Sequence, residues 1–185
     1  MKNKSKLLQL FAVLLLLAAN VRAVEPMKVA DTAPDFTLNT LDGKPVTLSA
    51  EMAKQPVVLV VLRGWPGYQC PLCTRQVHDF VSQADALAGK ARVVMVYPGP
   101  AENLQAHAAE FLKNADWPKN FMFVTDPDYA FTKSYGLRWN APSETAYPST
   151  FIIDGKGKIQ FAKTSKSHGG RASAADVVKA LGEMK

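Results

Sequence analysis

Two cysteines with two residues between them carry the clearest chemistry in this sequence. Cys70 and Cys73 are the only cysteines of the chain, and Pro71 follows Cys70 at a position typical of the first residue of a helix. Residues three apart on a helix share a face, so the two sulfurs can meet. Unpaired amides and the helix dipole favour a thiolate at a helix N-terminus, and the thiolate is the reactive form. The spacing therefore predicts a redox-active pair.

The apolar pattern after the pair distinguishes the two thiols. From Cys73 onward, apolar residues recur on one helical stripe, at Val77, Phe80, Val81, Ala84, Leu87 and Ala88. Cys73 begins this buried stripe, whereas Cys70 precedes the helix. We therefore expect an accessible Cys70 thiol and a sheltered Cys73 thiol, on a helix that Gly89 ends.

Strands and helices alternate around the pair. Residues 57–62 are all apolar, which predicts a strand buried on both faces and leading directly to the cysteines. We expect further strands at 93–96, 121–124, 150–154 and 158–162, helices at 102–114 and 126–135, a hairpin around Asp42–Gly43, and a final helix that Ser173 and Asp176 cap. This order predicts one α/β domain, in which helices flank a mixed central sheet with a parallel core and an N-terminal β-hairpin.

Residues 1–23 have the organisation of a secretory signal peptide. A lysine-rich start precedes the apolar run 7–19, and Val21 and Ala23 form a cleavage site for signal peptidase. The run is short for a transmembrane span, although an uncleaved anchor is the alternative. We expect export of a mature domain 24–185 to the periplasm, without stable membrane insertion after cleavage, where disulfides persist.

Composition and charge narrow the function further. The 185 residues are 48% hydrophobic and 21% charged, as in an ordinary globular domain. The formal charge of +6 falls to +2 without the leader, whose four basic residues leave 18 basic against 16 acidic residues. This balance gives no reason to expect a nucleic-acid partner. No nucleotide-binding motif is present, so we expect no cofactor, and electrons that pass to or from a protein dithiol or disulfide.

Four segments resemble the alkyl hydroperoxide reductase/thiol-specific antioxidant family, which comprises peroxiredoxins and peroxiredoxin-like redoxins. They are A-P-D-F-T-L at 33–38, T-D-P-D at 125–128, Tyr135–Gly136, and P-S-T-F-I-I-D-G at 148–155. The resemblance covers almost all of 29–185. It implies a thioredoxin-like fold and a thiol-dependent redox activity.

Two positions depart from the peroxiredoxin pattern. Those proteins resemble one another in P-x-x-x-T-x-x-C, and here Cys70 replaces the threonine while Cys73 has the register of the peroxidatic cysteine. Pro148 replaces the family's arginine and instead matches the cis-proline of thioredoxins. Both missing groups position peroxide, so their loss favours disulfide exchange. Arg63 or Arg75 is a candidate substitute, although we expect both to be surface charges.

The resemblance to thioredoxins also implies residues that position a substrate. Pro148 would shape the substrate groove, and the backbone of Tyr147 would meet a bound peptide. Trp65 precedes the active-site turn and either shields the thiols or covers the core. We expect residues 167–171 to form a turn into the last helix, and His78 to be a solvated helix residue.

The favoured hypothesis is thiol–disulfide exchange, in which Cys70 forms a mixed disulfide and Cys73 resolves it. The main alternative is reduction of a peroxide, in which Cys73 becomes a sulfenic acid and Cys70 condenses with it. A structural disulfide would close a four-residue loop and stabilise the chain little. A metal site is not expected, because two thiolates alone are an incomplete zinc site. A binding module whose disulfide does not turn over is the non-enzymatic alternative.

Overall fold

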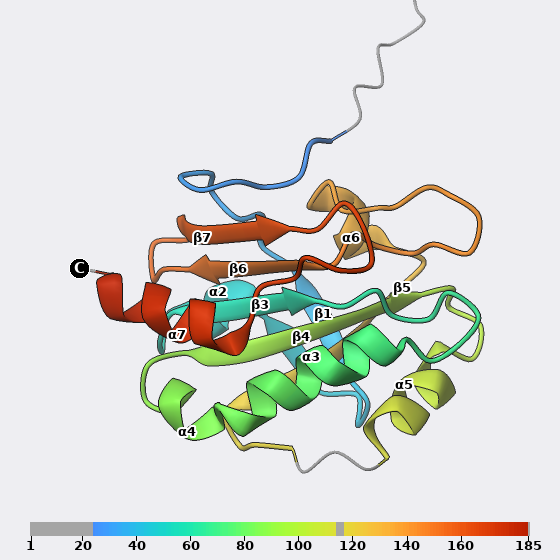
Figure 1. Cartoon of the computed structure of the whole chain (residues 1–185), viewed down its shortest axis with the longest axis horizontal. Coiled ribbons are helices and arrows are strands. Elements are labelled where there is room, and N and C mark those ends of the chain that lie inside the picture. The colour runs from blue at the N-terminus through green and yellow to red at the C-terminus, as the bar shows by residue number, and fades with distance from the viewer. Residues whose placement is uncertain (1–23, 114–116, 185) are drawn as a thin grey trace, which may run out of the picture.

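The computed structural model describes residues 24–113 and 117–184, so the predicted signal peptide lies outside the described residues. Seven strands form one sheet in the order β2-β1-β5-β4-β3-β6-β7 (Figure 1). The strands are β1 (Thr37–Thr40), β2 (Pro45–Thr47), β3 (Val57–Val61), β4 (Arg92–Gly99), β5 (Phe121–Pro127), β6 (Ser149–Ile153) and β7 (Ile159–Thr164). The helices are α2 (Leu48–Met52), α3 (Pro71–Ser82), α4 (Ala84–Leu87), α5 (Leu104–Leu112), α6 (Ala130–Ser134) and α7 (Ala174–Glu183).

The centre of the sheet is β3, β4 and β5, which run parallel to one another. All five residues of β3 are buried, as the apolar run predicts. On the other side of β3 lie β6 and β7, which pair antiparallel. The parallel core and the antiparallel final hairpin are therefore confirmed. The register pairs Val61 with Ser149, which places Pro148 beside the end of β3.

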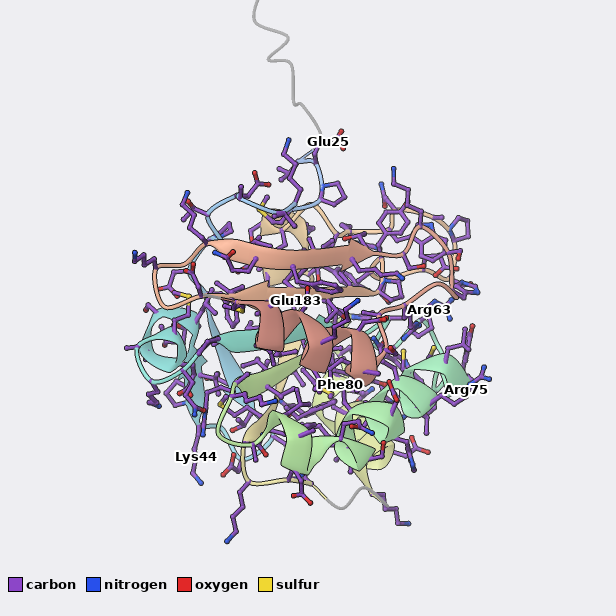
Figure 2. The ribbon with its side chains drawn as sticks, turned by 60° about the vertical axis from the view of Figure 1, so that its left-hand side comes forward. Glu25, Lys44, Arg63, Arg75, Phe80 and Glu183 are labelled. Carbon is purple, nitrogen blue, oxygen red and sulfur yellow. The ribbon has the colours of Figure 1, made fainter. Side chains whose placement is uncertain are left out.

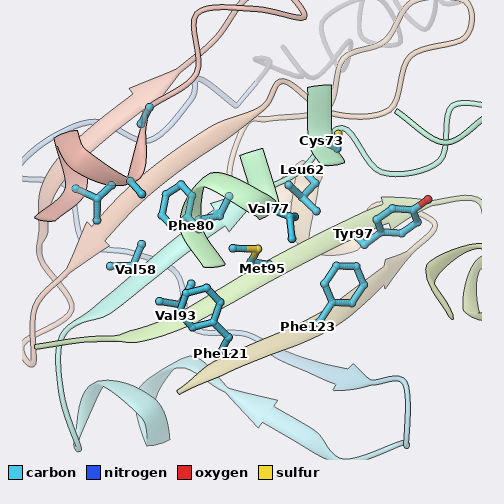
Figure 3. Close-up of a cluster of buried hydrophobic side chains, with 14 of the residues drawn as sticks. Val58, Leu62, Cys73, Val77, Phe80, Val93, Met95, Tyr97, Phe121 and Phe123 are labelled. Atoms are coloured by element: carbon cyan, nitrogen blue, oxygen red, sulfur yellow. The ribbon is translucent and has the colours of Figure 1, made fainter. Parts of the chain in front are cut away.

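The two faces of the sheet bury two separate clusters of apolar side chains. Val58 and Val60 point into a cluster that α3, α4, α5 and α7 cover, and both cysteines belong to it. Figure 3 shows Cys73 next to Leu62 at one end of this cluster. Val57, Leu59 and Val61 point into the opposite cluster, which α2 and α6 cover. Alternation along one buried strand thus separates the side of the sheet that carries the sulfurs from the side that does not.

The N-terminal hairpin extends the sheet at one edge. β1 and β2 pair antiparallel around Asp42–Gly43, where Gly43 has a φ of +79° that suits glycine. β1 also pairs with β5, so the hairpin joins the central sheet. The hairpin expected from the sequence is confirmed.

The predicted helix after the cysteines is divided in two. α3 ends at Ser82 and α4 begins at Ala84, because Gln83 leaves the helical conformation with φ −106° and ψ 16°. The Ser82 hydroxyl donates to the carbonyl of Asp79 across 2.7 Å, and such local hydrogen bonds compete with helix continuation. Gly89, with a φ of +76°, ends the segment as expected.

Two local features fix the surroundings of the cysteines. Gly64 has a φ of +71°, and a Cβ there would collide with the carbonyl oxygen of Pro98, so the turn before α3 requires glycine. At α7, Ser173 and Asp176 form the predicted capping box.

Within 24–113 and 117–184, no helix combines the length and apolar character needed to span a membrane.

Candidate active site

The two sulfurs lie at the first turn of α3. Cys70 is the N-cap residue in extended conformation, Pro71 is the first helical residue, and the amide of Cys73 donates to the Cys70 carbonyl across 3.0 Å. Both cysteines are free thiols in this structure. The placement of the pair at a helix N-terminus is as the sequence predicts.

The exposure of Cys70 differs from the expectation. Cys70 is only 3% exposed and Cys73 is 0% exposed, so the accessible first thiol expected from the sequence is wrong. The apolar stripe predicts only which face of α3 is buried. It does not predict that the segment before α7, which carries Arg171, covers Cys70. Only a small part of the Cys70 surface is therefore exposed to solvent.

Arg171 contacts both sulfurs. Its guanidinium donates to Cys73 Sγ across 3.4 Å and lies 3.8 Å from Cys70 Sγ through its other terminal nitrogen. It also donates to Gln76 Oε1 across 2.9 Å and to the His168 carbonyl across 3.1 Å, which fixes the plane of the guanidinium. The segment 167–171 is a turn into the last helix, as expected. The sequence does not predict the contact of Arg171 with the sulfurs, because no spacing relates this arginine to the cysteines.

Arg63 is a second arginine near Cys70, and unlike Arg171 it is fully buried. Its side chain is 3% exposed, so the expected surface charge is wrong at this position, whereas Arg75 is exposed as expected. Nε donates to Glu144 Oε2 across 2.7 Å, and one terminal nitrogen donates to the Ser143 carbonyl across 2.8 Å. The loop 137–148 folds over Arg63 and supplies both acceptors, which is why a charge can be buried there.

These contacts separate the acidities of the two thiols. A hydrogen bond from the Cys73 thiol is the largest cause that lowers the pKa of Cys70 to about 5, and the Cys73 amide, Arg171 and Arg63 act in the same direction against burial. Burial raises the pKa of Cys73 well above its usual range, and the neighbouring Cys70 sulfur raises it further. At neutral pH the pair is therefore a Cys70 thiolate beside a Cys73 thiol.

The residues of the turn 65–69 are held against β4 and α5. Trp65 packs on the cluster that contains both sulfurs, and its indole stacks on His107 with ring centroids 3.6 Å apart. The buried Tyr97 hydroxyl donates to Gln69 Oε1 across 2.9 Å, and Gln69 donates to the His107 carbonyl across 2.8 Å. Trp65 thus covers the core next to the thiols, which is one of the two roles expected from the sequence.

Two of the three residues expected to position a substrate, Tyr147 and Pro148, lie beside the end of β3. Among the described residues every peptide bond is trans, so the cis-proline expected at Pro148 is wrong. The trans form is the ordinary state of a proline peptide bond. The amide of Tyr147 donates to the Leu137 carbonyl and its carbonyl accepts from Ser149, while its ring stacks on Trp139. Substrate positioning by Tyr147, Pro148 and Trp65 stays a prediction.

Glu144 connects the two sides of the site. One carboxylate oxygen accepts from Arg63, and the other lies 2.8 Å from His168 Nε2. The backbone carbonyl of His168 in turn accepts a hydrogen bond from Arg171.

His78 is exposed on α3, as expected. The described residues contain no group of three or more histidine, cysteine, aspartate or glutamate side chains that could hold a metal ion.

The fold and the site together define a class of protein. A sheet with a parallel core and a dithiol at the start of the helix that follows the first core strand belongs to the thioredoxin-like thiol oxidoreductases. The Redoxin family model matches residues 28–181, and the chain belongs to this family. It is therefore an enzyme of the peroxiredoxin-like and thioredoxin-like redox proteins.

Individual relatives represent both branches of this class. The thioredoxin-like protein YneN of Bacillus subtilis is 30% identical over 128 residues, which are 69% of this chain and 66% of that protein. Peroxiredoxin Bcp of Escherichia coli is 27% identical over 157 residues, which are 78% of this chain and 93% of Bcp. The crystal structure of peroxidoxin BcpB from Mycobacterium tuberculosis has a TM-score of 0.63 at 24% identity, over 84% of this chain and 95% of that one. This likeness confirms the thioredoxin-like fold.

Proposed function

We propose that the protein is an exported thiol–disulfide oxidoreductase that cycles Cys70 and Cys73 between dithiol and disulfide. The observation that carries the proposal is the unequal acidity of two sulfurs that face one guanidinium. The Cys70 pKa is lowered and the Cys73 pKa is raised, although both sulfurs contact Arg171. A pair arranged in this way has one nucleophile ready at neutral pH and one thiol held in reserve.

The reaction begins with attack of the Cys70 thiolate on a sulfur of the substrate disulfide. A Cys70–substrate disulfide forms, and the other half of the substrate leaves as a thiolate. Cys73 then loses its proton and attacks Cys70, which releases the second substrate half as a thiolate. The protein is oxidised to the Cys70–Cys73 disulfide, and two electrons have passed to the substrate.

Arg171 supports both steps from one position. Before the reaction its positive charge stabilises the Cys70 thiolate, and during resolution the same charge favours ionisation of Cys73, 3.4 Å away. Resolution is intramolecular and does not depend on protein concentration. A protein dithiol would return the pair to its reduced form, since the mechanism uses no bound cofactor.

Reduction of a peroxide by the same pair is the second candidate. Arg171 lies closer to Cys73 Sγ than to Cys70 Sγ, 3.4 Å against 3.8 Å, and supplies a positive charge where the arginine of the peroxiredoxin pattern is missing. The similarity to Bcp supports this candidate. The complete burial of Cys73 and its raised pKa oppose it, because a peroxidatic cysteine must be a thiolate that peroxide can reach.

The proposed location is the periplasm, and the proposed mature domain is 24–185. Both rest on the leader of residues 1–23, with its lysines, its apolar run and its cleavage site. In that compartment a disulfide form of the pair would persist between encounters with a reductant.

Two single-cysteine variants separate the candidate reactions. With Cys73→Ser, a disulfide exchange enzyme traps a mixed disulfide on Cys70, which mass spectrometry of the intact protein detects. With Cys70→Ser, a peroxidase still consumes one equivalent of peroxide at Cys73. Rapid peroxide oxidation of Cys70→Ser in stopped-flow measurements, without a mixed disulfide in Cys73→Ser, would establish the peroxidase and overturn disulfide exchange.

A further inference from the structure

A pocket opens beside the dithiol, between α3 and the segment that leads into α7. It has a volume of about 340 Å³. One wall is formed by residues 168–173, and the other by Leu72, Arg75, Gln76 and Asp79 of α3. Arg171 lines this pocket and also contacts both sulfurs. The Arg171 side chain therefore lies between a group that occupies the pocket and the Cys70 sulfur.

Arg75 supplies a positive charge to this pocket. The other guanidinium, of Arg171, faces the Cys70 sulfur, and the single carboxylate in the lining belongs to Asp79. That carboxylate accepts a hydrogen bond from the amide of Ala174 across 2.7 Å at the start of α7. Arg75 is exposed on α3, where Figure 2 shows it at the surface, and it forms no ion pair within 24–113 and 117–184. Its charge is thus available to an anion.

The α3 wall of the pocket contains a buried amide that Arg171 holds in place. Gln76 is only 6% exposed, and its Oε1 accepts from Arg171 across 2.9 Å, which fixes the orientation of the amide. Its Nε2 has no hydrogen-bond partner among the described residues. Because Nε2 is itself buried, the amide forms part of the wall of the pocket and does not contact a group inside it.

We infer that the pocket binds a carboxylate that the disulfide substrate carries close to its reacting sulfur. The inference rests on the proposed function and names its substrate class. Arg75 binds the carboxylate, while the substrate sulfur meets Cys70. Attack by the Cys70 thiolate then proceeds as above, with one substrate half bonded to Cys70 and the other released as a thiolate.

Matched disulfides test the inference with the full-length reduced protein. The first pair of probes consists of 3,3′-dithiodipropionate, which carries two carboxylates, and the neutral 2-hydroxyethyl disulfide. We expect the carboxylate probe to oxidise the wild-type pair faster than the neutral probe, by about threefold, the size that an exposed charge pair provides. Arg75→Gln should abolish this preference by lowering the rate with the carboxylate probe toward the rate with the neutral probe. Lys166→Gln, an equal charge change at an exposed residue outside the pocket, should retain it.

A second pair of probes identifies the source of the carboxylate. Two disulfide-linked peptides differ only in Glu or Gln next to the half-cystine. A preference for the Glu peptide that depends on Arg75 assigns the carboxylate to a polypeptide substrate, and a preference confined to the small disulfides assigns it to a small molecule. Either result supports the pocket. Equal rates in every pair, or preferences that survive Arg75→Gln, overturn it.

A measurement without turnover separates this inference from the proposed function. The thioether 3,3′-thiodipropionate cannot exchange, and its binding is followed by NMR shifts of the amides of residues 168–173. Binding that Arg75→Gln removes, together with no oxidation by any disulfide, retains the pocket and contradicts the proposed function. Oxidation by all disulfides without thioether binding, and without a carboxylate preference, contradicts the pocket and retains the proposed function.

Discussion

Arg171 donates a hydrogen bond to Cys73 Sγ across 3.4 Å, although the two residues are 98 positions apart in the chain. The contact joins the start of α3 to the segment that leads into α7. Asp79 and Ala174 make a second contact between the same two segments, across 2.7 Å. The electrostatic environment of the dithiol therefore depends on how α7 docks, and not only on the helix that carries the cysteines.

Removal of the guanidinium should make Cys70 less acidic. Arg171→Gln eliminates a positive charge near both sulfurs, so we expect the pKa of Cys70 to rise by about one unit, as for loss of an adjacent opposite charge. The pH dependence of iodoacetamide alkylation measures this pKa. Arg171→Lys retains the charge and should recover most of the shift. An unchanged alkylation profile in Arg171→Gln would mean that the arginine is only structural.

The reduction potential of the pair should depend on pH in two regimes. Above the Cys70 pKa of about 5, reduction takes up one proton rather than two, because Cys70 stays a thiolate while Cys73 becomes a thiol. The potential should fall by about 60 mV per pH unit below this pKa and by about 30 mV per unit above it. Equilibration with a thiol–disulfide buffer at several pH values gives both slopes. A slope of about 60 mV per unit up to pH 8 would show that Cys70 is not acidic.

The lowered pKa of Cys70 determines the direction in which the stability of the reduced protein changes with pH. The folded-state pKa of Cys70 lies below the unfolded value of about 8.5. The thiolate therefore stabilises the reduced protein fully above pH 8.5 and loses this contribution as the pH falls through the folded-state pKa of about 5.

Loss of the Glu144 carboxylate should destabilise the fold. Glu144→Ala leaves the Arg63 guanidinium, which is 3% exposed, without its partner at 2.7 Å. We expect a decrease in the free energy of unfolding of about 3 kcal/mol, because an unpaired buried charge is costly. Urea unfolding monitored by tryptophan fluorescence measures the change.

An exposed ion pair supplies the matched control. Glu183 and Lys179 are 3.9 Å apart with side chains 67% and 79% exposed, so Glu183→Ala should change the free energy of unfolding by less than about 1 kcal/mol. Equal effects of Glu144→Ala and Glu183→Ala would contradict a structural role for the buried pair.

Local sequence patterns predicted most of the fold and the position of the proposed reacting pair at the start of a helix. An all-apolar run indicated the buried strand β3, Cys70 and Pro71 marked the start of α3, and Ser173 with Asp176 marked the start of α7. These features depend on neighbours within a few residues, where hydrophobic periodicity and capping chemistry act directly. The sequence by itself therefore determined where the sulfurs are and which helix holds them.

The surroundings of the sulfurs were decided by the tertiary structure alone. Periodicity along α3 predicted an exposed Cys70, yet the molecule buries it under a segment about 100 residues later in the chain. Likewise, Arg63 could be buried because the loop 137–148 brings Glu144 to it. Burial and charge pairing across such separations depend on which loops pack together, and these contacts add to the local interaction between the two cysteines in shifting both pKa values.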